Sequence, residues 1–489
     1  MMVIFIIILL LLVYFLLKQR KQYNEVWKYI HEIPGPPAVP LIGTNYKLMP
    51  SELIFARERE RMRQFYPIYK SWVLIFPFVH LAGPDDVELI LNKSIHNTKG
   101  ISHRIMLEDW LKTGLVISSG PKWHKRRKML TPAFHFNVLR NFVEVFYKES
   151  EALVESFRKH CGEPYIDVEK YVNQYSLYAF SGTSLGMPLR ENPKSKGYLR
   201  TLQQYKWHLS YRIEHPWLLI PFIFKRSSAY NGFMKTIKKL HEFSEYIIDE
   251  RTKMFNYNEH HANTKLPLLD LMLHIKQTSG DIDDEGIKEE LDTFIGAAHD
   301  TTAMSICFTL MLLANNQTIQ NEIYQEIESI IGDSKPPSYN DLAELKYMER
   351  CIKESLRLYP TVPVMNRILG EQVVTKSGYT IPKGCNVLIN IYDMHRSCQL
   401  WENPEKFDPD RFLPENTVNR HPFAYLPFSA GGRNCIGQKY AILELKTALC
   451  VILRNFILEP VDTPQNVMCK NQVTLRPANG IKVKFVPRV

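Results

Sequence analysis

We predict a mainly α-helical fold with small β-sheets, and three features of the sequence lead to this expectation. Apolar residues make up 45% of the 489 residues and charged residues 23%, as in an ordinary packed globular protein. Two long stretches, residues 143–160 and 284–316, repeat their apolar positions with the period of a helix. Short stretches of strand-forming residues are few and lie at residues 71–76, 386–392 and 481–486. This composition excludes a disordered chain, a collagen-like chain and a polytopic membrane protein.

Charge and cysteine content limit the partners and the compartment. The chain has 61 basic and 51 acidic residues, a net charge of +10. This modest excess favours an acidic protein surface or lipid headgroups as partners, and we expect no nucleic acid. The eight cysteines include no CxxC pair and are far too sparse for a disulfide-stapled secreted domain. We therefore expect reduced thiols that face the cytosol.

The first 17 residues, MMVIFIIILLLLVYFLL, carry no charge. As a helix they would span roughly 26 Å, close to the thickness of a bilayer core. A cleaved signal peptide is the alternative, but the basic residues follow the apolar run and no small-residue cleavage site comes after it. We expect a retained transmembrane anchor at residues 1–17, with the bulk of the chain on the cytosolic side.

The remaining chain divides into a basic, proline-rich hinge at residues 18–40 and one catalytic domain at residues 41–489. Prolines favour extended backbone, so the hinge should act as a stiff spacer. Within the domain, residues 295–314 are mostly apolar, and a second membrane span is an alternative to a buried core helix. His299 and Asp300 near the centre of this stretch favour the core helix.

Residues 427–441, PFSAGGRNCIGQKYA, form a glycine-flanked loop around a single thiol. Arg433 beside Cys435 favours the thiolate, which is a good axial ligand for iron. For an isolated cysteine, a buried structural residue would be the ordinary interpretation. The full pattern F-x-x-G-x-R-x-C-x-G, from Phe428 to Gly437, changes this interpretation because it resembles the haem-binding loop of the cytochrome P-450 family.

Three further motifs occur in the order of that family. Glu354-Ser-Leu-Arg357 is similar to its E-x-x-R helix, and FDPDRF at residues 407–412 is similar to its F-x-P-x-R-F segment. AHDTT at residues 298–302 resembles its oxygen-activating helix. The resemblance covers essentially the whole chain and implies the cytochrome P-450 fold, with an ionic triad of Glu354, Arg357 and Arg411. Residues 123–135 and 290–302 narrow it to the clan that includes the animal fatty-acid ω-hydroxylases.

The resemblance implies a haem-thiolate monooxygenase and assigns roles to single residues. Cys435 would be the axial ligand of the iron, Thr301 would lie beside the O₂ that the enzyme activates, and Asp300 would take part in proton delivery. Because Asp300 and Thr301 are adjacent on a helix, their side chains diverge by about 100°. The Thr301 hydroxyl can bond to the carbonyl of Ala297, four residues earlier. Purely local hydrogen bonding of both residues is the alternative.

The propionates of haem b need cations, and arginine suits carboxylates because its guanidinium binds them bidentately. A solvated surface charge is the alternative for any single arginine. By resemblance, the cofactor-binding residues are Trp123, Arg127, Arg367, Arg433, Phe428 and Gly437.

Three positions depart from the pattern of the family. Ala297 stands where many clan members carry a glutamate that esterifies the haem, so we expect the haem to be bound non-covalently. Ala298 stands where glycine is usual, and Arg396 is followed by Ser397-Cys398 where Asp-Pro is usual.

The clan resemblance implies an apolar substrate, with a fatty acid first and an isoprenoid hormone or a xenobiotic as alternatives. Segments expected to line the substrate pocket are 102–117, 204–224, 362–365 and 473–475, with Ala297. An isomerase or peroxide-consuming enzyme of the same fold and a non-catalytic haem sensor are the functional alternatives.

Electrons would come from NADPH through a flavoprotein NADPH-cytochrome reductase, with cytochrome b5 as a second donor. The expected location is the endoplasmic reticulum membrane, and the lipid bilayer is a further partner. A basic face could steer the reductase, with scattered solvated lysines as the alternative; its residues are Lys125, Arg126, Lys128 and Lys439. We expect His260-His261 to lie in a surface loop.

Overall fold

The computed structural model describes Tyr14 and residues 28–39, 42–44, 49–74, 76–255, 266–332 and 335–488. The predicted anchor apart from Tyr14, the first part of the predicted hinge and the His260-His261 pair lie outside the described residues. The described chain is mostly helical with small sheets, which confirms the predicted fold class.

Among the described residues, a long run of helices lies between groups of short strands nearer the two ends of the chain. The longer helices are α2 (Ser51–Phe65), α3 (Pro84–Leu91), α4 (Ile101–Leu111), α5 (Gly120–Leu130), α7 (Val143–Arg158), α8 (Val168–Thr183), α9 (Pro193–Glu214), α11 (Ser228–Met254), α12 (Leu268–Thr278), α13 (Asp284–Ala314), α14 (Gln317–Ile330), α16 (Lys346–Leu358) and α19 (Gln438–Asn455). The strands are β1 (Ile68–Val73), β2 (Phe76–Leu81), β3 (Ile166–Asp167), β4 (Val364–Ile368), β5 (Val373–Val374), β6 (Thr380–Ile381), β7 (Asn386–Asn390), β8 (Phe456–Pro460), β9 (Cys469–Gln472), β10 (Thr474–Pro477) and β11 (Lys482–Pro487).

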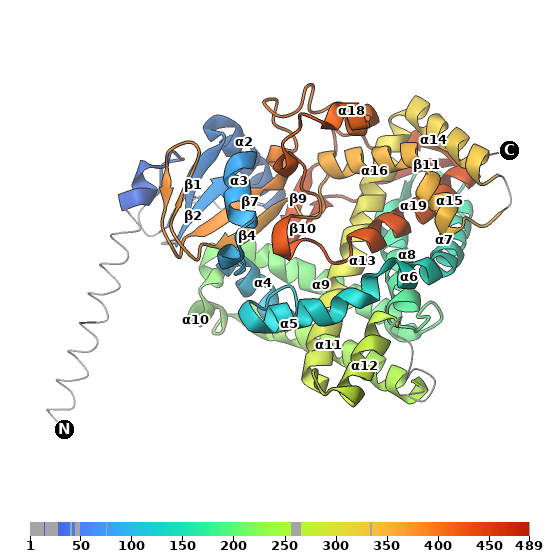
Figure 1. The fold of residues 1–489 in the computed structure, drawn as a ribbon, viewed down its shortest axis with the longest axis horizontal. Coiled ribbons are helices and arrows are strands. Elements are labelled where there is room, and N and C mark those ends of the chain that lie inside the picture. The colour runs from blue at the N-terminus through green and yellow to red at the C-terminus, as the bar shows by residue number, and fades with distance from the viewer. Residues whose placement is uncertain are drawn as a thin grey trace.

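Helix α13 forms the axis of the helical part of the molecule (Figure 1) and packs against α8, α11, α16 and α19. It begins at a capped N-terminus, where the Asp283 carboxylate accepts the Gly286 N–H at 2.8 Å. Although α13 is long and apolar enough to cross a membrane, 83% of its most apolar window is buried inside the protein. It is therefore a core helix, as His299 and Asp300 indicated.

The main sheet has the strand order β1-β2-β7-β4, and only the β2–β7 pair is parallel. Together with α2 and α3 it forms a smaller β-rich part beside the helices (Figure 1). The predicted strand at residues 71–76 is wrong in one respect, because Leu74 has a φ of 56° and Val73 pairs with Phe76 across a hairpin. The predicted strand at 386–392 ends at Asn390, and the one at 481–486 is confirmed as β11.

The described part of the predicted hinge packs onto this sheet. The Lys70 N–H of β1 donates to the carbonyl of Pro34 at 2.8 Å. Ile30 and Ile33 are fully buried. Residues 28–39 are thus attached to the β-rich part rather than standing apart from it.

Candidate active site

The Cys435 loop joins the short turn η8 (Gly431–Arg433) to α19. The Cys435 N–H donates to the carbonyl of Phe428 at 2.9 Å, which closes the loop. Gly431 has a φ of 69°, and a Cβ there would lie 2.0 Å from the Leu91 carbonyl, so only glycine fits. Since α19 begins three residues after Cys435, the thiol lies beside the unpaired N–H groups of a helix N-terminus.

Cys435 is exposed, although many protein atoms surround its thiol. Burial raises the pKa of Cys435, whereas the Gly437 N–H, which donates to the thiol, and the Arg127 guanidinium lower it. Both opposing groups favour the thiolate, the form that binds iron. Phe428 and Gly437 thus both contact Cys435 through their backbones, one by its carbonyl and the other by its N–H.

Four basic side chains converge near this loop: Arg367, Arg433, Lys99 and His103. Lys99 forms an isolated β-bridge with Arg367. Burial lowers the pKa of Arg367 to about 10, and burial with the nearby Arg367 and Arg127 charges lowers that of Arg433 to about 9. The pKa values of Lys99 and His103 fall well below their usual ranges through burial and the neighbouring cations.

This cluster is short of negative charge. Arg367 Nη2, Arg433 Nε and His103 Nδ1 are buried and have no hydrogen-bond partner among the described residues. Every charged neighbour that shifts these four pKa values is itself a cation. Because buried cations need anions, the donor set fits the two propionates of a haem placed against Cys435. Lys99 and His103 were not predicted, since nothing near them in sequence marks them.

Trp123 and Arg127, both on α5, approach the loop in different ways. The Arg433 guanidinium lies 4.6 Å from the centre of the Trp123 ring. Arg433 also donates to the carbonyls of Ser118 and, at 3.3 Å, Leu115. Arg127 instead donates from Nη1 and Nη2 to the backbone and side-chain oxygens of Asn434, each at 2.7 Å. Arg127 thus fixes the residue before the thiol.

Thr301 and Asp300 point in different directions from α13, as expected for adjacent helical residues. The Thr301 hydroxyl donates to the Ala297 carbonyl at 2.9 Å, the bond that the sequence suggested. Ala297 is exposed and Thr301 half-buried, so this side of α13 borders accessible space. Asp300 is buried, accepts from the Thr474 hydroxyl at 2.7 Å, and forms ion pairs with Lys206 and Arg476. These two cations hold the pKa of Asp300 well below its usual range despite burial.

The predicted ionic triad is present. Arg357 donates from Nε and Nη2 to the two carboxylate oxygens of Glu354 at 2.7 and 2.8 Å, and both residues are fully buried. Arg411 Nε lies 3.4 Å from the same carboxylate. Arg357 also donates to the His395 carbonyl at 2.6 Å, which ties α16 to the segment that leads to the Cys435 loop.

Only some of the residues expected to form a basic face are exposed. Lys128 and Lys439 are exposed, and Lys125 pairs with Asp281 at 2.7 Å. The prediction is wrong for Arg126, which is 7% exposed and packs 4.0 Å from the buried Glu290.

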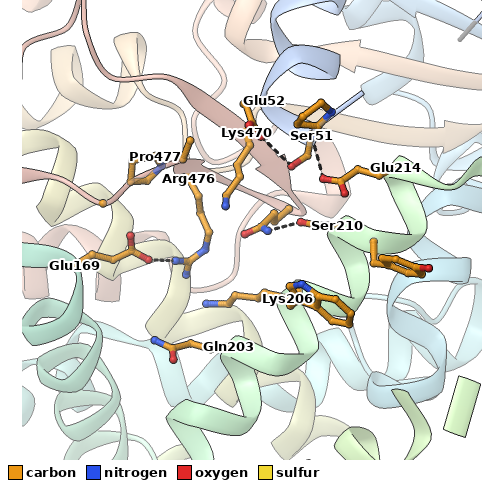
Figure 2. A pocket seen from close by; sticks show the side chains of 16 residues that line it. Ser51, Glu52, Glu169, Gln203, Lys206, Ser210, Glu214, Lys470, Arg476 and Pro477 are labelled. Carbon is orange, nitrogen blue, oxygen red and sulfur yellow. Dashed lines mark hydrogen bonds and ion pairs between the residues drawn. The ribbon is translucent and has the colours of Figure 1, made fainter. Parts of the chain in front are cut away.

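Two cavities lie side by side and share Ser51 and Glu214 in their walls. The first is a mainly apolar cavity of about 310 Å³ that contains parts of the predicted 102–117 and 204–224 segments, with Val364 and Val473. Sequence analysis missed its contributions from α2, β1 and β2, such as Phe55, Val73 and Phe78. The second is polar, has a volume of about 470 Å³, and is lined from α2, α9, β9 and β10 (Figure 2).

Comparison with known proteins gives matches over nearly the whole chain. The family model described as Cytochrome P450 matches residues 33–485. The chain is 36% identical over 457 residues to probable cytochrome P450 4aa1 of Drosophila melanogaster, covering 93% of this chain and 89% of that relative. It is 35% identical over 490 residues to cytochrome P450 4V2 of Homo sapiens, covering 96% and 93%. Cytochrome P450 4c3 of Drosophila melanogaster is 35% identical over 491 residues, with 96% and 91% covered.

Proposed function

Because the chain belongs to the cytochrome P450 family and is thus an oxidoreductase of the monooxygenase type, we propose that it hydroxylates a long apolar substrate, first of all a fatty acid. The observation that carries the proposal is the Cys435 thiol framed by buried cations that lack anionic partners. Inserting one oxygen atom of O₂ and reducing the other to water consumes two electrons and two protons. The chain must therefore hold haem, bind substrate and admit protons.

The haem would be held by the Cys435 thiolate and by the buried cations. Arg367 and Arg433 offer N–H groups without partners among the described residues, and Trp123 supports Arg433. Bound haem would supply the oxygen-activating chemistry, with electron density from the axial thiolate. Ala297 has no carboxylate, which supports a haem held without a covalent bond.

Thr301 and Asp300 would handle protons. Thr301 lies on the accessible side of α13, where its hydroxyl oxygen can accept a hydrogen bond while its O–H donates to the Ala297 carbonyl. Asp300 points in a different direction, towards Lys206 in the wall of the polar cavity, and would draw protons from water there. This division of roles follows from the divergence of the two side chains.

The apolar cavity would bind the substrate chain. Its walls are mainly apolar, which suits a lipid-like ligand. Attack at a terminal methyl needs a narrow channel, because an internal methylene is easier to oxidise. Since Ala297 cannot form a rigidifying haem ester, we expect looser regiochemistry than in glutamate-bearing relatives.

The chain would work at the endoplasmic reticulum membrane, with its catalytic domain in the cytosol. Large apolar side chains are exposed on η4 (Pro216–Leu219) and α10 (Pro221–Phe224), among them Trp217, Phe222 and Ile223. The exposed Ile42 and Phe76 border the apolar cavity next to them. Such a surface suits contact with lipid beside the substrate entrance. NADPH-cytochrome reductase, with cytochrome b5 as a second donor, would supply electrons.

A ferric absorbance titration of the haem-loaded protein with medium- and long-chain fatty acids tests the proposal. A saturable shift of the Soret band towards high spin, with hydroxylated product that requires NADPH and reductase, is the expected result. A thiolate spectrum without a shift would favour an isoprenoid hormone or a xenobiotic as the substrate. Turnover that needs no NADPH would favour an isomerase or a peroxide-consuming enzyme instead.

A further inference from the structure

The polar cavity of about 470 Å³ lies between the start of α2, one face of α9 and the β9–β10 hairpin (Figure 2). Its volume is in the range of ordinary small-molecule sites. Six residues of α9 line it at the spacing of one helix face, namely Gln203, Lys206, Trp207, Ser210, Tyr211 and Glu214. Because this face is polar and aromatic, the cavity is a candidate binding site of a different kind from its apolar neighbour.

The charged side chains in the wall are only partly paired with one another. Lys206 and Arg476 both bind Asp300 behind the wall, and Arg476 also pairs with Glu169. The remaining charged residues of the wall form no ion pair among the described residues; they are Lys470, Glu52 and Glu214. A cavity that keeps unpaired charges of both signs is complementary to a ligand that carries both signs.

The unpaired cation has hydrogen-bond donors near it. Figure 2 shows Lys470 of β9 reaching into the cavity. Gln472 projects from the same face of β9, two residues further on, and its amide donates to the Ser210 hydroxyl. That bond uses the oxygen of Ser210 and leaves its O–H for another acceptor. An ammonium with a nearby hydroxyl donor suits the phosphate of a ligand.

The unpaired acids and two aromatic rings suit a cation. The Glu214 carboxylate accepts the Ser51 N–H at 3.0 Å at the start of α2. Trp207 and Tyr211 stack with their ring centres 5.4 Å apart, and Trp207 is 58% exposed, so the cavity opens to the surface beside it. Aromatic faces are the surfaces that recognise quaternary ammonium groups, and a carboxylate nearby adds charge attraction.

Aromatic rings continue from the cavity to the exposed apolar surface of η4 and α10. Tyr211 stacks on His215 with their ring centres 4.1 Å apart, and His215 contacts the Trp217 ring at 5.2 Å. Trp217 is exposed, as are Phe222 and Ile223 beyond it. Aromatic side chains of this kind favour the headgroup layer of a bilayer. A lipid with its acyl chains beside Trp217 is thus positioned to place its headgroup in the cavity.

We propose that the polar cavity binds the phosphocholine headgroup of a membrane phospholipid. The phosphate would accept from Lys470 and Ser210, and the trimethylammonium group would lie against Trp207 and Tyr211, close to Glu214. The inference goes beyond the proposed function and does not require it, because binding involves neither haem nor the hydroxylated substrate. No covalent bond forms or breaks.

Isothermal titration calorimetry of the full-length, haem-loaded protein in a maltoside detergent, which contains no choline, measures the binding. The probe is dihexanoylphosphatidylcholine, whose short chains keep it monomeric in water. It should bind saturably, and free phosphocholine should compete with it but bind more weakly. Dihexanoylphosphatidylglycerol, which has the phosphate without the ammonium, should bind roughly threefold to tenfold more weakly than the choline lipid.

Two variants separate the contacts of the headgroup. Trp207→Ala should weaken binding of the choline lipid roughly threefold to tenfold and leave the glycerol lipid unchanged. Lys470→Gln should weaken binding of both lipids, because both contain the phosphate. Lys196→Gln, at an exposed position of α9 outside the cavity, is the matched control and should bind both lipids as wild type does. Equal losses for both lipids in Trp207→Ala, or tighter binding of the glycerol lipid by wild type, would overturn the proposal.

Saturation-transfer NMR of the wild-type protein guards against variants that do not fold. Irradiation of the aromatic protons should transfer saturation to the choline methyl groups of the probe, and excess phosphocholine should abolish this transfer. Saturation confined to the acyl chains would reveal apolar contact alone and refute a headgroup site. Free phosphocholine that binds as tightly as the lipid would refute a membrane phospholipid as the source of the headgroup.

Discussion

The Thr301 hydroxyl lies 2.9 Å from the Ala297 carbonyl and donates its proton to it, one turn earlier on α13. The same carbonyl is the normal acceptor for the Thr301 N–H, so it serves two donors at this point of the helix. Thr302 forms the equivalent bond to Ala298 at 2.9 Å, but it is buried, whereas Thr301 borders accessible space. Position on the helix, rather than hydrogen bonding, distinguishes the two threonines.

This difference predicts the effect of Thr301→Ala. Loss of the hydroxyl on the accessible side should divert electrons to hydrogen peroxide and lower product per NADPH severalfold, while Thr301→Ser should restore coupling. Thr302→Ala removes the same type of bond from the buried side and is the matched control. Peroxide and product are measured together under reductase-driven turnover. Tight coupling in Thr301→Ala would contradict the role.

Local patterns predicted the fold class and two of the long helices. The periodicity of residues 143–160 predicted α7 because this helix buries one apolar face, and the apolar stretch in 284–316 predicted α13, which is buried on nearly every side in its second half. The hairpin between β1 and β2 could not be predicted, since it depends on Leu74 at positive φ, which residues other than glycine seldom adopt.

Motifs predicted the part of the site that is contiguous in sequence, namely the Cys435 loop. They missed Lys99 and His103, because only the pairing of Lys99 with Arg367 brings these distant segments together. One error was avoidable. Arg126 falls on the same face of α5 as Trp123 and Leu130, three residues after the first and four before the second, and all three are buried.

The buried triad predicts that Glu354→Ala yields little haem-loaded protein. Arg357 would lose both carboxylate bonds while fully buried, and an unpaired buried charge costs about 3–5 kcal/mol. The haem-to-protein ratio and the free energy of unfolding in urea are the measurements. Glu405→Ala, which removes a largely exposed partner of Arg396, is the control and should leave haem content nearly unchanged. Normal haem content in Glu354→Ala would refute this role.

Arg367→Met should have opposite effects on the haem-free and haem-loaded proteins. Without haem, the variant removes a buried cation whose Nη2 lacks a partner among the described residues, so stability should hold or rise. With haem, it removes a charge-assisted bond worth about 1.5–3 kcal/mol, which weakens haem binding roughly 10- to 100-fold. Transfer of haem to apomyoglobin measures the affinity. Exposed Arg226→Met should change neither quantity, and equal haem retention in both variants would argue against propionate binding by Arg367.

Glu444 makes the free energy of unfolding depend on pH. It is fully buried on α19, its only hydrogen bond among the described residues is from Ser176 at 2.8 Å, and burial raises its pKa from 4.5 to about 8. The folded state therefore holds the proton more tightly than the unfolded state. The contribution of protonated Glu444 to the free energy of unfolding is complete below pH 4.5. It falls by up to about 1.4 kcal/mol per pH unit as the pH rises towards 8. Urea unfolding at pH 6 and 8 measures this effect: the free energy of unfolding of Glu444→Gln should rise relative to that of wild type as the pH rises. An equal difference between the two proteins at both pH values would exclude a titrating Glu444.

Because residue 297 is an alanine, we expect haem to be bound without a covalent link, and Ala297→Glu should create that link. Ala297 is exposed on the side of α13 that carries Thr301. The clan that the sequence resembles implies a glutamate at this position that esterifies the haem. Haem should therefore be extracted from wild type by acidic butanone, whereas Ala297→Glu should retain it after turnover and give product more restricted to the chain end. Ala298→Glu, about 100° further round the helix, should release its haem as wild type does. Haem that resists extraction from the wild-type protein would show that another side chain forms the bond, since Ala297 has no group that can.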